Sequence, residues 1–513
     1  MKGLSAYKPW LPLLAAATLA GCSLAPEYQR PEAPVAQAWP AQPDMRGDGR
    51  GVQPADRVAP EQGVAASDIG WRQFFRDPRL QALIELALVN NRDMRIAVQR
   101  IEEARAQYGV QRGEQFPSIG VGASGTRQRT PEDLRFGGAD APAISSQYQA
   151  GLALTAFEID LFGRLRNLSE AARQQYLATE QARRTVHINL VGQVAQAYFA
   201  LRAAETQLNL VQQTLGSRQA SFDLVSQRYE AGVASELELN QSRTLLDTAR
   251  SDLAAFARQR SQATNALVQL IGQPLPDELP EPLPFGSEQL VASVPAGLPS
   301  DLLTRRPDIL AAENALRAAN ANIGAARAAF FPTISLTGNI GTASPTLGGL
   351  FESGTGAWSF APQIAIPLFA GGSLRAGVDL ARARDNIAVA QYEQAIQQAF
   401  REVADALAGE ATYESQLTSL RALEAASART LELSNLRYEG GIDDFLQVQT
   451  AQISYYSAQQ QLVQAGLDSL INRTELYKAL GGGWVENTVQ SGTGPQDGGP
   501  QPEAAAGVSP AAR

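Results

Sequence analysis

The chain has 513 residues, of which 44% are apolar and 19% are charged, so it can form a large core and global disorder is excluded. Asp and Glu number 52 against 43 Lys and Arg, and the formal net charge of −9 gives no support to nucleic-acid binding. One cysteine, Cys22, and one histidine, His187, exclude an internal disulfide, a Cys/His metal cluster and most nucleophilic catalytic sites. We therefore expect neither enzyme activity nor a bound metal.

The N-terminus has the features of a bacterial lipoprotein signal. Two lysines precede an apolar stretch at 11–19, which is too short to span a bilayer as a mature helix. The Leu-Ala-Gly-Cys sequence at 19–22 resembles the lipobox, which implies removal of residues 1–21 as a signal peptide and attachment of lipid to Cys22. Ser23, in place of an inner-membrane retention Asp, implies sorting to the outer membrane. The alternative is an incidental cysteine in an ordinary signal peptide.

Segments without periodicity flank the main body of the chain. Residues 22–70 are rich in Pro, Gly, Ala and polar side chains, so we expect a lipidated tether that follows the protein surface. Residues 483–513 have a similar composition, and we expect a disordered tail there.

The main body contains an internal duplication. Arg-Tyr-Glu-Ala-Gly at 228–232 recurs as Arg-Tyr-Glu-Gly-Gly at 437–441, and Phe-Pro-Ser-Ile at 116–119 recurs as Phe-Pro-Thr-Ile at 331–334. The landmarks keep their order, which predicts a two-fold domain repeat rather than a short-repeat solenoid. The expected divisions are repeat 1 at 71–273, a linker at 274–300 and repeat 2 at 301–482.

Each half contains a long proline-free segment, between Pro142 and Pro274 and between Pro367 and Pro495, which permits very long helices. Apolar residues recur every seven positions before and after the glycine at 232, with a polar break at Arg260. The seam is Val194, Leu201, Leu208, Leu215, Phe222 and Tyr229, then Leu239, Leu246, Leu253 and Leu267. This pattern predicts antiparallel coiled-coil hairpins that turn at 230–234 and 439–443. Residues 164–228 would extend about 97 Å at ~1.5 Å per residue.

The segments before these helices alternate apolar residues with small or polar ones. The alternation is clear at 332–342 and 357–368 and weaker at 117–127 and 147–159. These lengths fit transmembrane strands, and the lipobox favours a membrane protein over a soluble sandwich. Four strands cannot close a barrel and open edges are not tolerated in lipid, so we expect several copies to pool their strands.

Three stretches resemble the outer-membrane factors, the TolC-like channel family, in the lipoprotein branch that serves tripartite RND-type efflux pumps. They are Trp-Arg-Gln-Phe-Phe-Arg-Asp-Pro-Arg-Leu at 71–80, Leu-Pro-Ser-Asp-Leu-Leu-Thr-Arg-Arg-Pro-Asp-Ile at 298–309, and the repeated Arg-Tyr-Glu-X-Gly turns. The resemblance covers about residues 24–482. It implies a mixed α and β fold, in which a homotrimer forms one 12-stranded transmembrane β-barrel, four strands per chain, continued by a 12-helix periplasmic α-barrel. Residues 22–70 and 274–300 would contribute to an equatorial belt.

The same resemblance implies a function and partners. The protein would be the lipid-anchored outer-membrane exit channel of a multidrug efflux system, a passive conduit for drugs and other small amphipathic compounds. Its partners would be a periplasmic adaptor, an inner-membrane transporter and outer-membrane lipid, with no nucleic acid and no cofactor beyond the lipid on Cys22.

The resemblance also assigns a periplasmic gate. Leu446, five positions after Gly441, keeps the apolar residue that rings the closed aperture in related channels, whereas Thr450 departs from the acidic residue expected one helical turn later. No Lys or Arg occurs between 438 and 472, so three copies would form an acidic mouth; a solvated helix end is the alternative. The acidic residues of this mouth are Glu439, Asp443 and Asp444. The turn residues expected to contact the adaptor are Tyr229, Gly232, Tyr438 and Gly441.

Other functions fit parts of the sequence. Within the channel class, the substrate could be metal ions or, as in type I secretion, a polypeptide. Only three methionines occur, so a methionine-lined copper path has little material. A structural lipoprotein that spans the periplasm belongs to a different class, and the alternating strands argue against it because a spacer needs no barrel.

Overall fold

The computed structural model describes residues 23–41, 65–135, 142–291, 294, 297 and 299–488. The chain divides into two compact units. The first contains the described residues up to Val35 with Arg95–Thr185 and Pro307–Gln398, and the second contains the remainder. Each unit takes segments from both sequence halves, so the expected division into 71–273 and 301–482 does not describe compact units. The two longest helices, Arg164–Glu230 and Ser373–Glu439, cause this difference, because each begins in the first unit and ends in the second.

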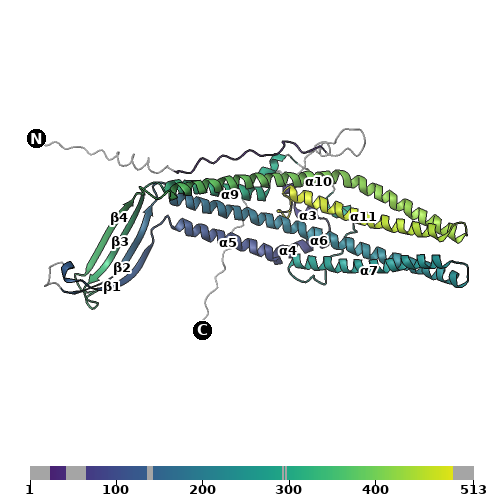
Figure 1. Ribbon diagram of the computed structural model, residues 1–513, viewed down its shortest axis with the longest axis horizontal. Helices are drawn as coiled ribbons and strands as arrows, with labels where there is room; N and C mark the ends of the chain where they lie inside the picture. Colours follow the sequence, from purple (N-terminus) through teal and green to yellow (C-terminus); the bar gives the residue numbers. More distant parts are fainter. Residues whose placement is uncertain are drawn as a thin grey trace. The chain divides into compact units, whose positions relative to one another are not determined.

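The first unit contains a four-stranded antiparallel sheet in the order β1-β2-β3-β4 (Figure 1). Its strands are β1 (Ile119–Arg129), β2 (Ile144–Ile159), β3 (Thr333–Ser344) and β4 (Gly356–Ala365). The central pair joins strands from the two sequence halves, and Gly151 lies opposite Gly341 in the register. A Cβ on either glycine would collide with the backbone of the facing strand, so the two strands can approach only without side chains there.

The helices of the first unit are α5 (Arg92–Gly113), α9 (Pro307–Ala328) and the first parts of α6 (Arg164–Glu230) and α10 (Ser373–Glu439). Short side chains let them pack closely, as in the buried cluster of Ala171, Ala318 and Ala321. The connection between β1 and β2 includes the 3₁₀ turn η2 (Glu132–Leu134).

The start of the mature chain follows the surface of this unit, and specific hydrogen bonds fix residues 23–35 there. Ser23 donates a 3.0 Å hydrogen bond to Asn167, and Arg30 donates to both carboxylate oxygens of Glu313 at 2.6 and 3.2 Å. Arg317 adds a third bond to Glu313, at 2.8 Å. The segment lacks periodicity because specific polar contacts, rather than an apolar face, hold it.

The second unit contains the remaining parts of α6 and α10 and a further set of helices and 3₁₀ turns. These are α3 (Trp71–Phe74), α4 (Pro78–Asn90), α7 (Glu236–Ile271), α8 (Leu302–Arg305), α11 (Phe445–Ala479), η1 (Ala66–Asp68), η4 (Ser287–Gln289) and η5 (Pro299–Asp301). Asp77, in the 71–80 stretch, has two structural roles. It caps the N-terminus of α4, and it accepts a 2.7 Å hydrogen bond from the Tyr198 hydroxyl. Burial raises the pKa of that hydroxyl, and the bond to Asp77 raises it further.

The expectation of disorder from residue 483 is wrong for residues 483–488. Trp71 and Arg72 donate backbone hydrogen bonds to the carbonyls of Val485 and Glu486, at 3.0 and 3.2 Å. The Trp484 ring lies 5.0 Å from the ring of His187. These contacts join the C-terminal segment to α3 and α6, and composition alone does not reveal such pairing. Residues 489–513 lie outside the described part of the chain, as do Cys22 and the expected signal peptide.

Arg306, in the 298–309 stretch, stabilises the packing of helices through its hydrogen bonds. Its guanidinium is buried and donates to Glu402 at 2.9 Å and to the Ala479 carbonyl at 3.0 Å, which connects the end of α8 to α10 and α11. None of the helices in the described ranges has the length and hydropathy needed to cross a lipid bilayer.

Candidate functional site at the helical turns and the sheet

The repeated Arg-Tyr-Glu-X-Gly sequence forms the same helix ending twice. At the first turn the N–H of Val233 reaches the carbonyl of Arg228 at 2.9 Å, and Gly232 reaches Tyr229 at 2.9 Å. At the second turn the corresponding pairs are Ile442 with Arg437 at 2.9 Å and Gly441 with Tyr438 at 3.0 Å. This is the Schellman motif, which requires a left-handed residue after the helix. Glycine supplies it, with φ of 76° at Gly232 and 69° at Gly441.

The two turns belong to hairpins that pack against each other near their ends. Val225 of α6 forms a buried cluster with Tyr438, Phe445 and Val448 of the second hairpin. The Arg228 guanidinium lies 4.8 Å from the centre of the Tyr438 ring, a cation–π contact. Tyr438 is therefore a packing residue, whereas its counterpart Tyr229 is exposed. The repeated motif thus gives one backbone conformation but two different side-chain environments.

Leu446 and Thr450 lie on the opposite face of α11 from this cluster. Leu446 is 49% exposed, and Thr450, one helical turn later, is exposed and donates its hydroxyl to the Leu446 carbonyl at 2.8 Å. Ile453 continues the same exposed face. The expected gate residues thus lie together on one unpacked helix face, and their assignment as a gate stays a prediction.

The expected acidic mouth contains an ion pair that the sequence interpretation missed. Arg437 binds the Asp443 carboxylate through two hydrogen bonds, at 2.6 and 2.8 Å, across the second turn. These bonds lower the pKa of Asp443 and raise the pKa of Arg437. Glu439 and Asp444 are exposed, and Asp444 precedes α11 without a side-chain capping bond. The net charge near the turn is therefore less negative than three unpaired carboxylates would give.

A buried arginine links the hairpins further along. Arg218 of α6 is buried, donates to the Leu245 carbonyl of α7 at 2.8 Å and lies 4.9 Å from the centre of the Tyr456 ring of α11. Burial lowers the pKa of its guanidinium. The Tyr456 hydroxyl donates to Asp252 at 3.1 Å, which ties α11 to α7. No local pattern predicts this network, except that Arg218 follows Val211 by seven positions.

The sheet has one apolar face and one small or polar face. Strand side chains alternate, so the register decides which residues share a face. One row crosses all four strands through Val121, Leu152, Ile340 and Trp358. On the opposite face, Ser124 pairs with Gln149 and Asn339 pairs with Ser359. Large apolar side chains of the first face are exposed, including Trp358 and Val121.

A bulge in β2 keeps the apolar face continuous. Between Leu154 and Phe157, β2 has one residue more than the facing part of β3, and Ala156 has a φ of 46°. One extra residue reverses the faces that follow, so Phe157 and Ile159 join the apolar face and Glu158 avoids it. Glu158 instead accepts hydrogen bonds of 2.6 and 2.9 Å from Arg164. This shift explains the weak alternation at 147–159.

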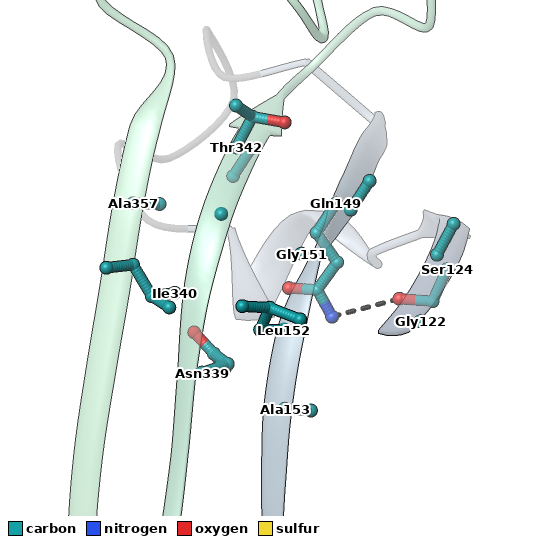
Figure 2. Close-up of a pocket in the computed structure, with 14 residues that line it drawn as sticks. Gly122, Ser124, Gln149, Gly151, Leu152, Ala153, Asn339, Ile340, Thr342 and Ala357 are labelled. Carbon is teal, nitrogen blue, oxygen red and sulfur yellow. Dashed lines mark hydrogen bonds between the residues drawn. The ribbon is translucent and has the colours of Figure 1, made fainter. Parts of the chain in front are cut away.

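Figure 2 shows a shallow hollow in the sheet, where Gln149 donates to the Ser124 hydroxyl at 2.9 Å. Its volume is about 200 Å³, and the glycines at 122, 151 and 341 leave the space open. All of its lining residues are uncharged. This part of the sheet therefore offers a solute only neutral contacts.

A two-faced antiparallel sheet and two long helical hairpins in one chain define the class of TolC-like outer-membrane channels. The protein-family model described as outer membrane efflux protein matches residues 83–273 and 298–482. The chain is 48% identical over 473 residues to the toluene efflux pump outer membrane protein TtgC of Pseudomonas putida, covering 92% of this chain and 95% of that protein. The antibiotic efflux pump outer membrane protein ArpC of Pseudomonas putida matches to the same extent.

A solved structure agrees with these sequence matches. The outer-membrane channel MtrE of Neisseria gonorrhoeae, in its open state, superposes with a TM-score of 0.79 at 39% identity, covering 91% of this chain and all of that one. The chain belongs to the outer membrane efflux protein family. It is an outer-membrane component of an efflux system, as the sequence predicted, and its family is a transport family rather than an enzyme family.

Proposed function

We propose that three copies of the chain form one channel, in which the sheets close a 12-stranded β-barrel and the hairpins form a 12-helix periplasmic α-barrel. The main observation that supports this proposal is that the four-stranded sheet has two unpaired edges. β1 and β4 are its edges, and an edge strand in lipid needs a partner for its backbone groups. β4 has 10 residues, about 33 Å at ~3.3 Å per residue, which when tilted matches the ~25 Å apolar band of outer-membrane barrels.

The exposed face of α11 supports an aperture at the periplasmic end. Three copies of Leu446 would converge into an apolar ring, which opposes ion passage by excluding water. Thr450 supplies a hydroxyl where related channels have a carboxylate. The lower ring is therefore neutral, and the Arg437–Asp443 pair further weakens the field of the mouth.

The turns themselves present apolar side chains suited to a partner. Val233, Leu237 and Ile442 are each 65–67% exposed, next to the Schellman glycines Gly232 and Gly441. Exposed apolar residues gathered at helix ends favour protein contacts. A periplasmic adaptor that joins the channel to an inner-membrane transporter is the proposed partner, and lipid on Cys22 is the proposed anchor.

The proposed cargo is organic. Relatives that are 48% identical are named for toluene and antibiotic efflux, and neutral residues line the hollow in the sheet. The runner-up cargoes are metal ions and secreted polypeptide. An efflux-deficient host that carries the matching adaptor and transporter should regain tolerance to toluene and antibiotics, with no change in tolerance to copper or silver.

Purified protein tests the assembly. Light scattering in detergent should give the mass of three chains, and planar bilayers should show discrete conductance steps. A monomer without conductance would favour the structural spacer lipoprotein instead.

A further inference from the structure

A basic pocket lies in the first unit, between the start of the mature chain and the base of the sheet. Its volume is about 420 Å³. Leu24, two residues after Cys22, forms one part of its wall. Phe330 and Phe331, which follow α9 and precede β3, form another part. The rest comes from α9 and the first turns of α10.

Three guanidinium groups and one carboxylate line this pocket. Arg375, Asp379 and Arg382 recur at helical spacing on one face of α10. Arg327 of α9 donates to the Leu24 carbonyl at 3.1 Å, which holds the N-terminal segment against the pocket. Arg375 has no hydrogen bond or ion pair with any residue in the described ranges. The pocket is therefore cationic and has unused donors.

The single carboxylate neutralises this charge only weakly. Asp379 lies 3.5 Å from Arg382, and both side chains are more than half exposed. Exposed pairs of this kind contribute little and exchange readily with other partners. An incoming anion can therefore compete for Arg382.

Apolar side chains lie between the pocket and the sheet. Phe330 and Phe331 are exposed, and β3 begins two residues later with the apolar face that starts at Ile334. In the proposed channel that face contacts lipid, and the lipid on Cys22 would enter the membrane beside Leu24. Under the proposed function, both features place the pocket at the level of the lipid headgroups.

We propose that this pocket binds the phosphate of an anionic phospholipid, such as phosphatidylglycerol, from the leaflet that faces the periplasm. Arg375 and Arg382 would donate paired hydrogen bonds to the phosphate oxygens, a geometry that suits guanidinium groups. Phe330 and Phe331 would contact the glycerol and upper acyl carbons. The bound lipid fixes the start of the mature chain to α9 and α10.

Native mass spectrometry of the full-length trimer tests the proposal. Wild-type protein and the Arg375→Gln/Arg382→Gln variant are incubated with phosphatidylglycerol, phosphatidylcholine or inorganic phosphate. The wild type should retain phosphatidylglycerol. The variant should retain at least about tenfold less of this lipid, because charge-assisted hydrogen bonds from two arginines are lost. Inorganic phosphate should not displace the lipid, since it lacks the apolar contacts.

A double variant of exposed arginines elsewhere on α10, Arg421→Gln/Arg429→Gln, is the matched control and should retain lipid like the wild type. Equal retention by the pocket variant would overturn the proposal, and displacement by phosphate would show a free-anion site instead. Conductance in planar bilayers tests the channel function separately from lipid binding. The pocket variant should conduct like the wild type even though it loses the lipid. Wild-type trimers that bind lipid without conducting would contradict the channel and leave the pocket assignment standing.

Discussion

At the scale of single residues, Glu313 is the point where the mature N-terminus is fixed to α9. Its side chain is 4% exposed and accepts hydrogen bonds from Arg30 and Arg317 and one of 3.2 Å from Tyr28. Burial alone would raise the pKa of this carboxyl, but the arginine hydrogen bonds outweigh burial and hold the pKa below its usual value. The cluster therefore stabilises the segment in its ionised form.

Replacing Glu313 with Gln should loosen residues 23–35. We expect a loss of about 2 kcal/mol, or roughly a 30-fold increase in the rate of limited proteolysis within this segment at pH 7, because cleavage follows the population in which the segment is detached. The folded-state pKa lies below the unfolded value of about 4.3. The stabilisation is therefore complete above that value and is lost as the pH falls through the folded-state pKa. The difference between wild type and Glu313→Gln should thus disappear in acid.

The control for this prediction is Glu102→Gln, which breaks an exposed pair with Arg105 at 3.4 Å and should leave the cleavage rate of the segment nearly unchanged. A constant difference across the acidic range would show that ionisation of Glu313 does not stabilise the segment.

Leu446 is the residue on which the gate prediction depends. Leu446→Ala should raise single-channel conductance because it widens the proposed ring, and it should change stability by no more than about 0.5 kcal/mol because the side chain lies outside the buried cluster. Planar-bilayer recording at matched protein loading measures this. Leu433→Ala, a similarly exposed leucine on α10, should not alter conductance. Equal conductance for wild type and Leu446→Ala would place the constriction elsewhere.

At the scale of helices, the heptad prediction found the hairpins and one of their two buried seams. Val194, Leu201 and Leu246 of the predicted seam are buried, whereas Leu208, Leu215 and Phe222 are half-buried. A second buried row, again with a spacing of seven residues, consists of Ala204, Val211, Arg218 and Val225. A coiled coil buries two positions in each heptad, and the leucines marked only one of them. The second buried heptad position was not predicted, because Arg218 occupies it once and interrupts its apolar pattern.

At the scale of strands, we predict that the β2 bulge sets which side chains face the apolar side of the sheet. Deleting Ala156 should place Phe157 and Ile159 on the polar face and Glu158 among the apolar residues, so outer-membrane trimers should be largely lost. Trimer yield on non-denaturing gels of outer-membrane fractions measures this.

Ala156→Gly is the matched control. It keeps the bulge and removes the cost of a positive φ, about 1 kcal/mol for a residue with a side chain, so the yield should be unchanged or higher. Normal trimer yield after the deletion would mean that the bulge does not set the register.

At the scale of the whole molecule, assembly should not require the lipid. Protein contacts hold the start of the mature chain through Ser23, Leu24 and Arg30, independently of Cys22. Cys22→Ser, expressed with a cleavable non-lipoprotein signal, should therefore still give outer-membrane trimers with unchanged conductance. Absence of assembled trimers, with wild-type protein expressed from the same vector as the control, would show that lipidation is needed for assembly.

The amino-acid sequence was enough to predict the class of protein and most of its local structure. Strand alternation, heptads and helix-ending glycines are properties of neighbouring residues, so they predicted β3, β4, the long helices and both turns. The resemblance at 71–80 and 298–309 identified the family that the comparisons confirm. The resemblance to related channels also implied Leu446 and Thr450 as gate residues; the structure places both on an exposed face, and their role as a gate stays a prediction.

Contacts between side chains that are distant in the sequence became visible only in the folded chain. Arg30 reaches Glu313 across 283 positions in the chain, and Trp71 reaches Val485 across more than 400, so neither contact leaves a local pattern. The same holds for the composition of the two compact units, each built from both halves of the sequence. The physical reason is that burial and hydrogen bonding depend on neighbours in space, whereas periodicity reports only neighbours in the chain.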